Sequence, residues 1–261
     1  MREMDVKQER LGQERRNNQG CLMKIIKYDD AHNVVIEFQD KYKANVHTEY
    51  KHFLSGNVKN PYHPSVFNVG MIGNKYPAFT NGKATKEHLI WRHMLERCFD
   101  DKFKNKHLAY QNVSCCNEWL IFENFYEWLH SQENFEKWLN NDKWAIDKDI
   151  LVKGNKIYSP ETCCLVPQNV NKLFTKRDAL RNDLSIGVRK NGNGFLAQWC
   201  NPFTNKKEYS KTYSTIDEAF EQYKCSKESL IKQVAQDELS KGNITLQCHN
   251  SMMNYVVEIT D

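Results

Sequence analysis

The chain has 261 residues, of which 40% are hydrophobic, and a formal net charge of +4. This length predicts two or three small modules, each with its own core. The chain has no run of eighteen apolar residues and its first sixteen residues are rich in charge, which argues against a helical membrane span and a secretory signal. We therefore expect a cytoplasmic protein with no membrane partner.

The nine cysteines are predicted to be reduced thiols, because their number is odd and no secretory signal accompanies them. A zinc site usually shows two pairs of cysteines at C-x2-C spacing. Here the closest cysteines are the adjacent doublets Cys115/Cys116 and Cys163/Cys164. We interpret the cysteines as buried structural residues.

Basic residues are concentrated in one segment. Residues 172–211 contain nine Lys or Arg and three Asp or Glu, whereas residues 86–150 contain nine basic and twelve acidic side chains, and 212–261 contain four and eight. The small net charge alone does not indicate a partner. A basic segment between acidic flanks, however, indicates a polyanionic binding partner.

Residues 1–19 form a polar leader in this interpretation, and residues 20–80 form a small β-rich module followed by a linker. Short apolar runs at 22–26, 34–38 and 44–47 are separated by Asp and Asn turns, as in a series of strands. Gly and Pro then recur from 56 to 77, which places a boundary near residue 80.

Residues 85–175 are predicted to begin with helices, because apolar residues between 89 and 98 recur with a helical period. The aromatic residues from Trp119 to Trp138 are expected in the core. A strand at 144–151, a turn at 154–155, a strand at 163–166 and a short helix opening near Pro167 follow.

Residues 184–238 predict three strands, at 186–189, 195–199 and 209–213, joined by turn-forming Asn, Gly and Pro residues. A helix follows, with Ser214 or Thr215 as its N-cap. Residues 239–261 are predicted to be an acidic tail. The fold class is therefore α+β with several modules, the last being a three-stranded antiparallel sheet with one packed helix.

Four features occur in a fixed order within 186–223. They are Ile186-Gly187-Val188-Arg189, Phe195-Leu196-Ala197, the basic and aromatic pair Lys207 and Tyr209, and Thr212-Tyr213-Ser214-Thr215-Ile216-Asp217-Glu218-Ala219 with Tyr223 beyond it. This order resembles the AP2 DNA-binding domain over about fifty residues. The resemblance implies that double-stranded DNA is bound by the sheet and that the helix supports it.

A sheet that exposes Arg189, Gln198, Lys207 and Tyr209 would offer guanidinium, amide and ring contacts to one groove of DNA. The resemblance implies that Arg189 and Lys207 reach bases or phosphates, and that Phe195 and Tyr209 buttress sugars or thymine methyl groups. The remaining predicted DNA contacts are Lys190, Arg177 and Arg181.

Two positions depart from the family pattern. Lys211 replaces a glycine, and Gln198 stands where plant members often have an acid, so no base preference is carried over. The alternatives are a basic module without a ligand and an RNA-binding module. The K/R-G-F-x-F spacing of RNA-binding sheets is absent from the sequence.

The preceding segment carries a second pattern. It consists of Ile146-Asp147-Lys148-Asp149, Gly154-Asn155, Tyr158-Ser159-Pro160-Glu161-Thr162-Cys163 and Leu165-Val166-Pro167-Gln168-Asn169-Val170-Asn171. It resembles the HNH endonucleases, which have a ββα-metal fold and in mobile elements are often followed by an AP2 domain. The resemblance implies that Asp147 and Asn171 hold a Mg²⁺ or Mn²⁺ ion if the protein is an active nuclease.

The candidate catalytic residues are Asp147, Lys148 and Asn171, but Lys148 stands where the family has its general-base histidine. A lysine accepts a proton near neutrality only with a strongly lowered pKa, and its neighbours Asp147 and Asp149 would raise that pKa. Three interpretations stay open: a decayed nuclease fold kept for DNA binding, an active nuclease with another base, and a structural hairpin and helix. His130, His107 and His93 are conceivable bases that no pattern supports.

The sequence thus predicts a double-stranded DNA-binding protein of phage or mobile-element type, working in the host-cell cytoplasm if it is phage-encoded. Its HNH-like module is expected to be degenerate, and DNA binding is expected to need no cofactor. The alternatives are a metal-dependent endonuclease of homing type and a protein-interaction module.

Overall fold

The computed structural model describes residues 3–175 and 184–259, and the chain divides into two compact units, 1–129 and 130–261. It contains several small sheets together with helices, so the α+β class is confirmed. The units divide the chain differently from the predicted modules, because 85–129 belongs with the N-terminal sheet and 130–175 with the C-terminal one. Arg177 and Arg181 lie outside the described residues.

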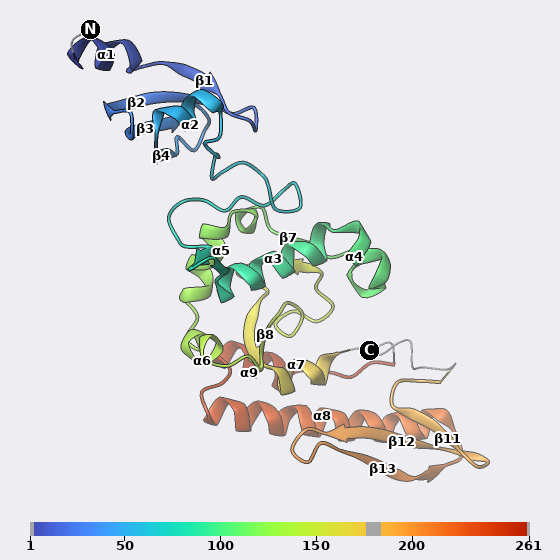
Figure 1. Ribbon diagram of the computed structural model, residues 1–261. Helices are drawn as coiled ribbons and strands as arrows, with labels where there is room; N and C mark the ends of the chain where they lie inside the picture. The colour runs from blue at the N-terminus through green and yellow to red at the C-terminus, as the bar shows by residue number, and fades with distance from the viewer. Residues whose placement is uncertain (1–2, 176–183, 260–261) are drawn as a thin grey trace. The chain divides into compact units, whose positions relative to one another are not determined.

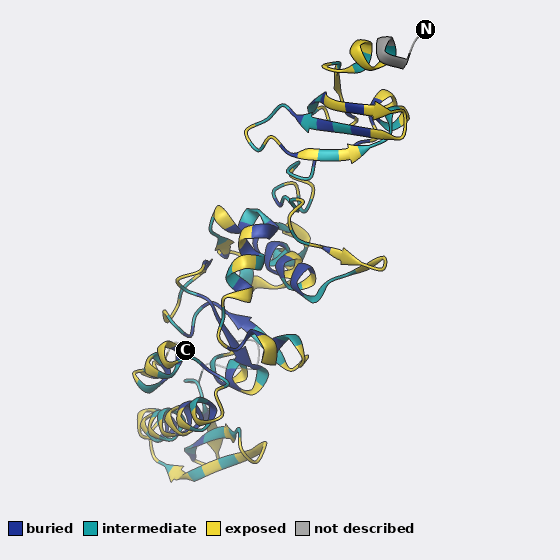
Figure 2. Ribbon diagram, turned by 90° about the vertical axis from the view of Figure 1, so that its left-hand side faces the viewer, coloured by how far each residue is buried: buried dark blue, intermediate teal, exposed yellow. Residues whose placement is uncertain are grey.

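The first unit begins with a four-stranded antiparallel sheet. Its elements are α1 (Glu3–Arg10), β1 (Glu14–Arg16), β2 (Leu22–Asp30), β3 (Asn33–Phe38), β4 (Asn45–Thr48) and α2 (Tyr50–Ser55), and the strands pair in chain order. Buried and more exposed residues alternate along much of β2 and β3 (Figure 2), as expected for strands with one face on a core. The polar segment 1–19 is not separate from this module, because β1 pairs with β2.

The rest of the first unit is mainly helical. It comprises a hairpin of β5 (Phe79–Thr80) and β6 (Lys83–Ala84), then α3 (Lys86–Phe99), α4 (Asp101–Lys106), η1 (Leu108–Tyr110), β7 (Ser114–Cys115), η2 (Glu118–Leu120) and α5 (Phe122–His130). Trp91 of α3 donates from Nε1 to the carbonyl oxygen of Trp119 over 2.7 Å, and both rings are buried. The prediction that aromatic residues form this core is confirmed.

The second unit opens with α6 (Phe135–Leu139), β8 (Trp144–Asp147), β9 (Ile157–Tyr158), β10 (Cys164–Pro167) and α7 (Gln168–Phe174). β8 and β10 pair antiparallel, all four residues of β10 are buried, and α7 follows β10 directly. The predicted succession of strand, strand and helix is therefore present.

A meander of β11 (Val188–Asn191), β12 (Gly194–Asn201) and β13 (Lys206–Tyr213) follows, and α8 (Ile216–Ser240) runs along one face of it (Figure 1). Thr215 caps α8, and Glu218 completes a capping box with it. Gly187 has a φ of +71°, and a Cβ there would lie 2.1 Å from the ring of Tyr223. Only glycine lets this helix residue approach the start of the sheet so closely.

The C-terminal segment, predicted as an acidic tail, packs against α8. It forms α9 (Leu246–Met253), and Cys248, Met252 and Val257 are buried in one cluster with residues of α8. The acidic composition was misleading, because apolar residues four apart give this short segment a buried face. Thr245 caps α9 by accepting from the backbone N–H of Cys248.

Candidate nucleic-acid interface

The sheet of the second unit has one covered and one open face. Val188 and Ala197 form a cross-strand pair and are buried in the cluster with α8. Their neighbours Arg189 and Leu196 are paired in register, so both project from the opposite face. On that face Gln198 lies opposite Tyr209, two residues beyond Leu196.

The open face carries four side chains that the sequence predicted as DNA contacts: Arg189, Gln198, Lys207 and Tyr209. Lys207 is two residues from Tyr209 on β13 and therefore shares its face. Arg189, Lys207 and Tyr209 are exposed, with 51% of the Tyr209 surface accessible. One face of the sheet thus presents a large aromatic ring and two cations to solvent.

A hydrogen bond orders the centre of this face. Arg189 donates from Nη1 to Oε1 of Gln198 over 2.8 Å, from β11 to β12. The bond joins the two side chains across neighbouring strands, and it leaves the Gln198 amide nitrogen to donate elsewhere. The open face therefore offers several donors in a fixed arrangement.

The sequence did not identify two further polar residues that lie beside this face. Asn191 donates from Nδ2 to Oγ1 of Thr212 over 2.8 Å, which links β11 to β13 at one end of the sheet. Both side chains are exposed. Asn191 is two residues from Arg189 on β11, and Thr212 pairs with Leu196 across β12 and β13. Both therefore follow from the strand register, which the sequence does not show.

Phe195 does not lie on the open face, which corrects its predicted contact with sugars or thymine methyl groups. Its ring packs against the cluster that includes Ala197 and residues of α8. Lys190 is paired with Phe195 in register, so it projects toward the side of α8, although its side chain is exposed. Phe195 and Lys190 therefore do not lie on the open face with Arg189.

In the strand, strand and helix segment, Asp147 ends β8 and is buried. Its Oδ1 accepts from the backbone N–H groups of Asp149 and Ile150, both over 2.8 Å. Burial is the main cause that raises the pKa of Asp147 to about 7, and the neighbouring carboxylate of Asp149 adds to the rise. The carboxyl group thus shapes the turn that leaves β8.

Lys148 is buried and its amine donates to Oδ2 of Asp149 over 3.2 Å. The same amine lies 5.9 Å from the centre of the Tyr158 ring. The amine is thus already engaged by a carboxylate and lies beside an aromatic ring. This geometry does not favour Lys148 as a general base.

Asn171 lies within α7 and is half-buried, and α7 contacts both β8 and β10. Within the described residues, no group of three or more His, Cys, Asp and Glu side chains is placed to hold a metal ion. One oxygen of Asp147 is already occupied by two amides. The Mg²⁺ or Mn²⁺ site on Asp147 and Asn171 that the HNH resemblance implies stays a prediction.

No protein-family model, curated protein or solved structure matches the chain. Among the described residues, no helix is both long and apolar enough to cross a membrane. The functional interpretation therefore depends on the geometry of the chain itself.

Proposed function

We propose that the protein binds double-stranded DNA through the open face of β11, β12 and β13. The observation that carries this proposal is the grouping of Arg189, Gln198, Lys207 and Tyr209 on one exposed face, with the other face covered by α8. Arginine and glutamine suit the edges of guanine and adenine, and a sheet can enter the major groove. The basic surplus of residues 172–211 supports the same partner.

The test is a fluorescence anisotropy titration of a labelled duplex of mixed sequence at several salt concentrations. We expect the association constant to fall steeply with added salt, because bound cations release counterions from the phosphates. Arg189→Ala and Lys207→Ala are each expected to weaken binding about tenfold and, where a phosphate contact is lost, to reduce the salt slope by about one.

Lys232→Ala is the matched control, because Lys232 is an exposed lysine of α8, on the helix that covers the other face. It removes the same charge from the same unit. Equal effects of Lys232→Ala and Lys207→Ala would show that only overall charge matters. Binding that is absent, or insensitive to salt, would contradict the proposal.

We propose further that the protein binds DNA without cutting it. Two residues of the HNH-like segment support this: Lys148 is paired with Asp149, and Asp147 accepts hydrogen bonds within a turn. When supercoiled plasmid is incubated with the protein and Mn²⁺ and run on a gel, it is expected to shift in mobility and to remain unnicked. Metal-dependent nicking that Asp147→Ala abolishes would establish the endonuclease alternative instead.

A further inference from the structure

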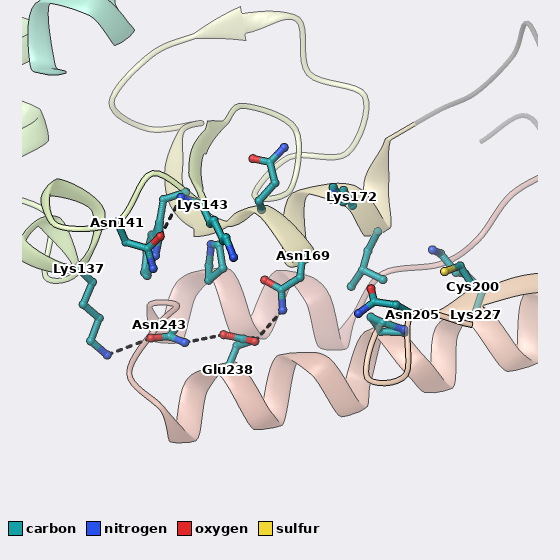
Figure 3. Close-up of a pocket in the computed structure, with 15 residues that line it drawn as sticks. Lys137, Asn141, Lys143, Asn169, Lys172, Cys200, Asn205, Lys227, Glu238 and Asn243 are labelled. Carbon is teal, nitrogen blue, oxygen red and sulfur yellow. Dashed lines mark hydrogen bonds between the residues drawn. The ribbon is translucent and has the colours of Figure 1, made fainter. Parts of the chain in front are cut away.

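The second unit contains a cavity of about 790 Å³ that no sequence pattern predicted. Its walls come from α6 and the start of β8, from α7, from the end of β12 and the loop that follows it, and from α8 (Figure 3). Small-molecule sites in proteins commonly have volumes of about 300–1,000 Å³. The cavity is large enough for a ligand of nucleotide size.

The charge of the cavity wall is unbalanced. Four lysines line it, namely Lys137, Lys143, Lys172 and Lys227, with Glu238 as the one carboxylate among the lining residues. These lysines come from three separate stretches of sequence, so no local pattern explains their meeting. A concave wall with this excess of positive charge concentrates anions.

Glu238 is occupied by structural contacts. It is only 5% exposed, its Oε1 accepts from Nδ2 of Asn169 over 2.9 Å, and its Oε2 accepts from Nδ2 of Asn243 over 2.7 Å. Figure 3 shows these bonds as one chain that continues from Asn243 to Lys137. Glu238 therefore ties α7 to the end of α8.

Lys137 is also structural, because its amine donates to the carbonyl oxygen of Gly242 over 2.9 Å and to Oδ1 of Asn243 over 3.1 Å. The other three lysines differ. Within the described part of the chain, no carboxylate forms an ion pair with the amine of Lys143, Lys172 or Lys227. Three cations are left for a ligand.

Lys227 is the most informative of the three. It is partly buried, and burial lowers its pKa to about 8, with a smaller opposing effect from Cys200. A desolvated ammonium group without a counterion is unfavourable, and an anion bound beside it removes that penalty. The remaining lining includes the Trp144 indole and the amides of Gln168 and Asn205, which suit a ring with polar edges.

We propose that this cavity binds a free nucleotide, with its phosphate groups on Lys143, Lys172 and Lys227. Lysine is a common phosphate ligand because its ammonium is a compact point charge. The lysines of this site are not residues of the open face, so the proposal does not depend on the proposed DNA binding. DNA also carries phosphate groups, so the test must distinguish binding of a free nucleotide from binding of DNA.

The experiment is isothermal titration of the full chain with ATP, with inorganic pyrophosphate and with adenosine. We expect ATP and pyrophosphate to bind and adenosine to bind at least about tenfold more weakly, because the lysines recognise charge. Lys227→Met and Lys172→Met are each expected to lower the ATP affinity about tenfold. Lys232→Met, at an exposed position of α8 outside the cavity, is expected to leave it unchanged.

Two results would overturn the proposal: no binding of ATP or pyrophosphate, or equal losses in Lys227→Met and Lys232→Met. Thermal melts of each variant confirm folding, and Lys172→Met provides a second test at an exposed residue if Lys227→Met does not fold. A short duplex is added as competitor. Displacement of ATP by the duplex would show that the cavity belongs to the DNA surface, whereas failure to compete supports a separate nucleotide site.

Discussion

The buried carboxyl group of Asp147 has two opposite effects on the stability of the fold. Its Oδ1 accepts two backbone N–H groups that shape the turn after β8, while burial and Asp149 raise its pKa to about 7. The folded state therefore binds more protons than the unfolded state between about pH 4 and 7. The stability contributed by Asp147 is lost as the pH rises through this range.

Asparagine at this position keeps the accepting oxygen and removes the charge. We expect Asp147→Asn to stabilise the second unit at pH 8, on the order of 1 kcal/mol, and by less at pH 5. Asp147→Ala removes the acceptor together with the charge, and is expected to destabilise by about 1–2 kcal/mol at pH 5 and by less at pH 8. Thermal unfolding at the two pH values measures both variants, and equal destabilisation by Asn and Ala would refute a penalty from the charge.

The sequence could have placed Phe195 correctly. Phe195 and Gln198 are three residues apart on β12, and an odd separation puts side chains on opposite faces of a strand. The three apolar residues Phe195, Ala197 and Trp199 then identify the covered face. The cross-strand bond from Arg189 to Gln198 could not be predicted, because it depends on a register set by turn lengths.

At the scale of elements, local signals predicted most of the second unit. Turn residues located the strands of the meander, and a cap located the start of α8 at Thr215. The same signals were overlooked for α9, whose cap is Thr245. The cavity was not predictable, because its lysines meet only when α7 and the end of α8 are joined through Glu238.

The packing of α9 can be measured by a matched pair of substitutions. Met252 is fully buried against the cluster with α8, whereas Val256 is 51% exposed. We expect Met252→Ala to cost about 2–5 kcal/mol, because it leaves a cavity in the core, and Val256→Ala to change stability by at most about 0.5 kcal/mol. Denaturant midpoints measure both. Equal small effects would mean that α9 is not part of the core.

At the scale of the molecule, length predicted a small number of modules but did not place their limits. The two compact units meet in sequence near residue 130, at the end of α5, where no Gly or Pro cluster marks a boundary. The Gly- and Pro-rich stretch from 56 to 77 lies inside the first unit. Composition indicates loops, but only contacts between distant segments decide which elements share a core.

The division into units makes a prediction about where DNA is bound. The open face of β11, β12 and β13 lies wholly in 130–261, together with all of the basic surplus of residues 172–211. We expect a fragment of residues 130–261 to bind a mixed-sequence duplex within about threefold of the full chain and with the same salt slope, because the slope reports the number of phosphates neutralised. The fragment 1–129 is expected to bind at least about a hundredfold more weakly.

Circular dichroism establishes that each fragment is folded, and Arg189→Ala in 130–261 is expected to repeat the loss of affinity predicted for the full chain. Strong, salt-dependent binding by a folded 1–129 fragment would instead place the main DNA contacts in the first unit.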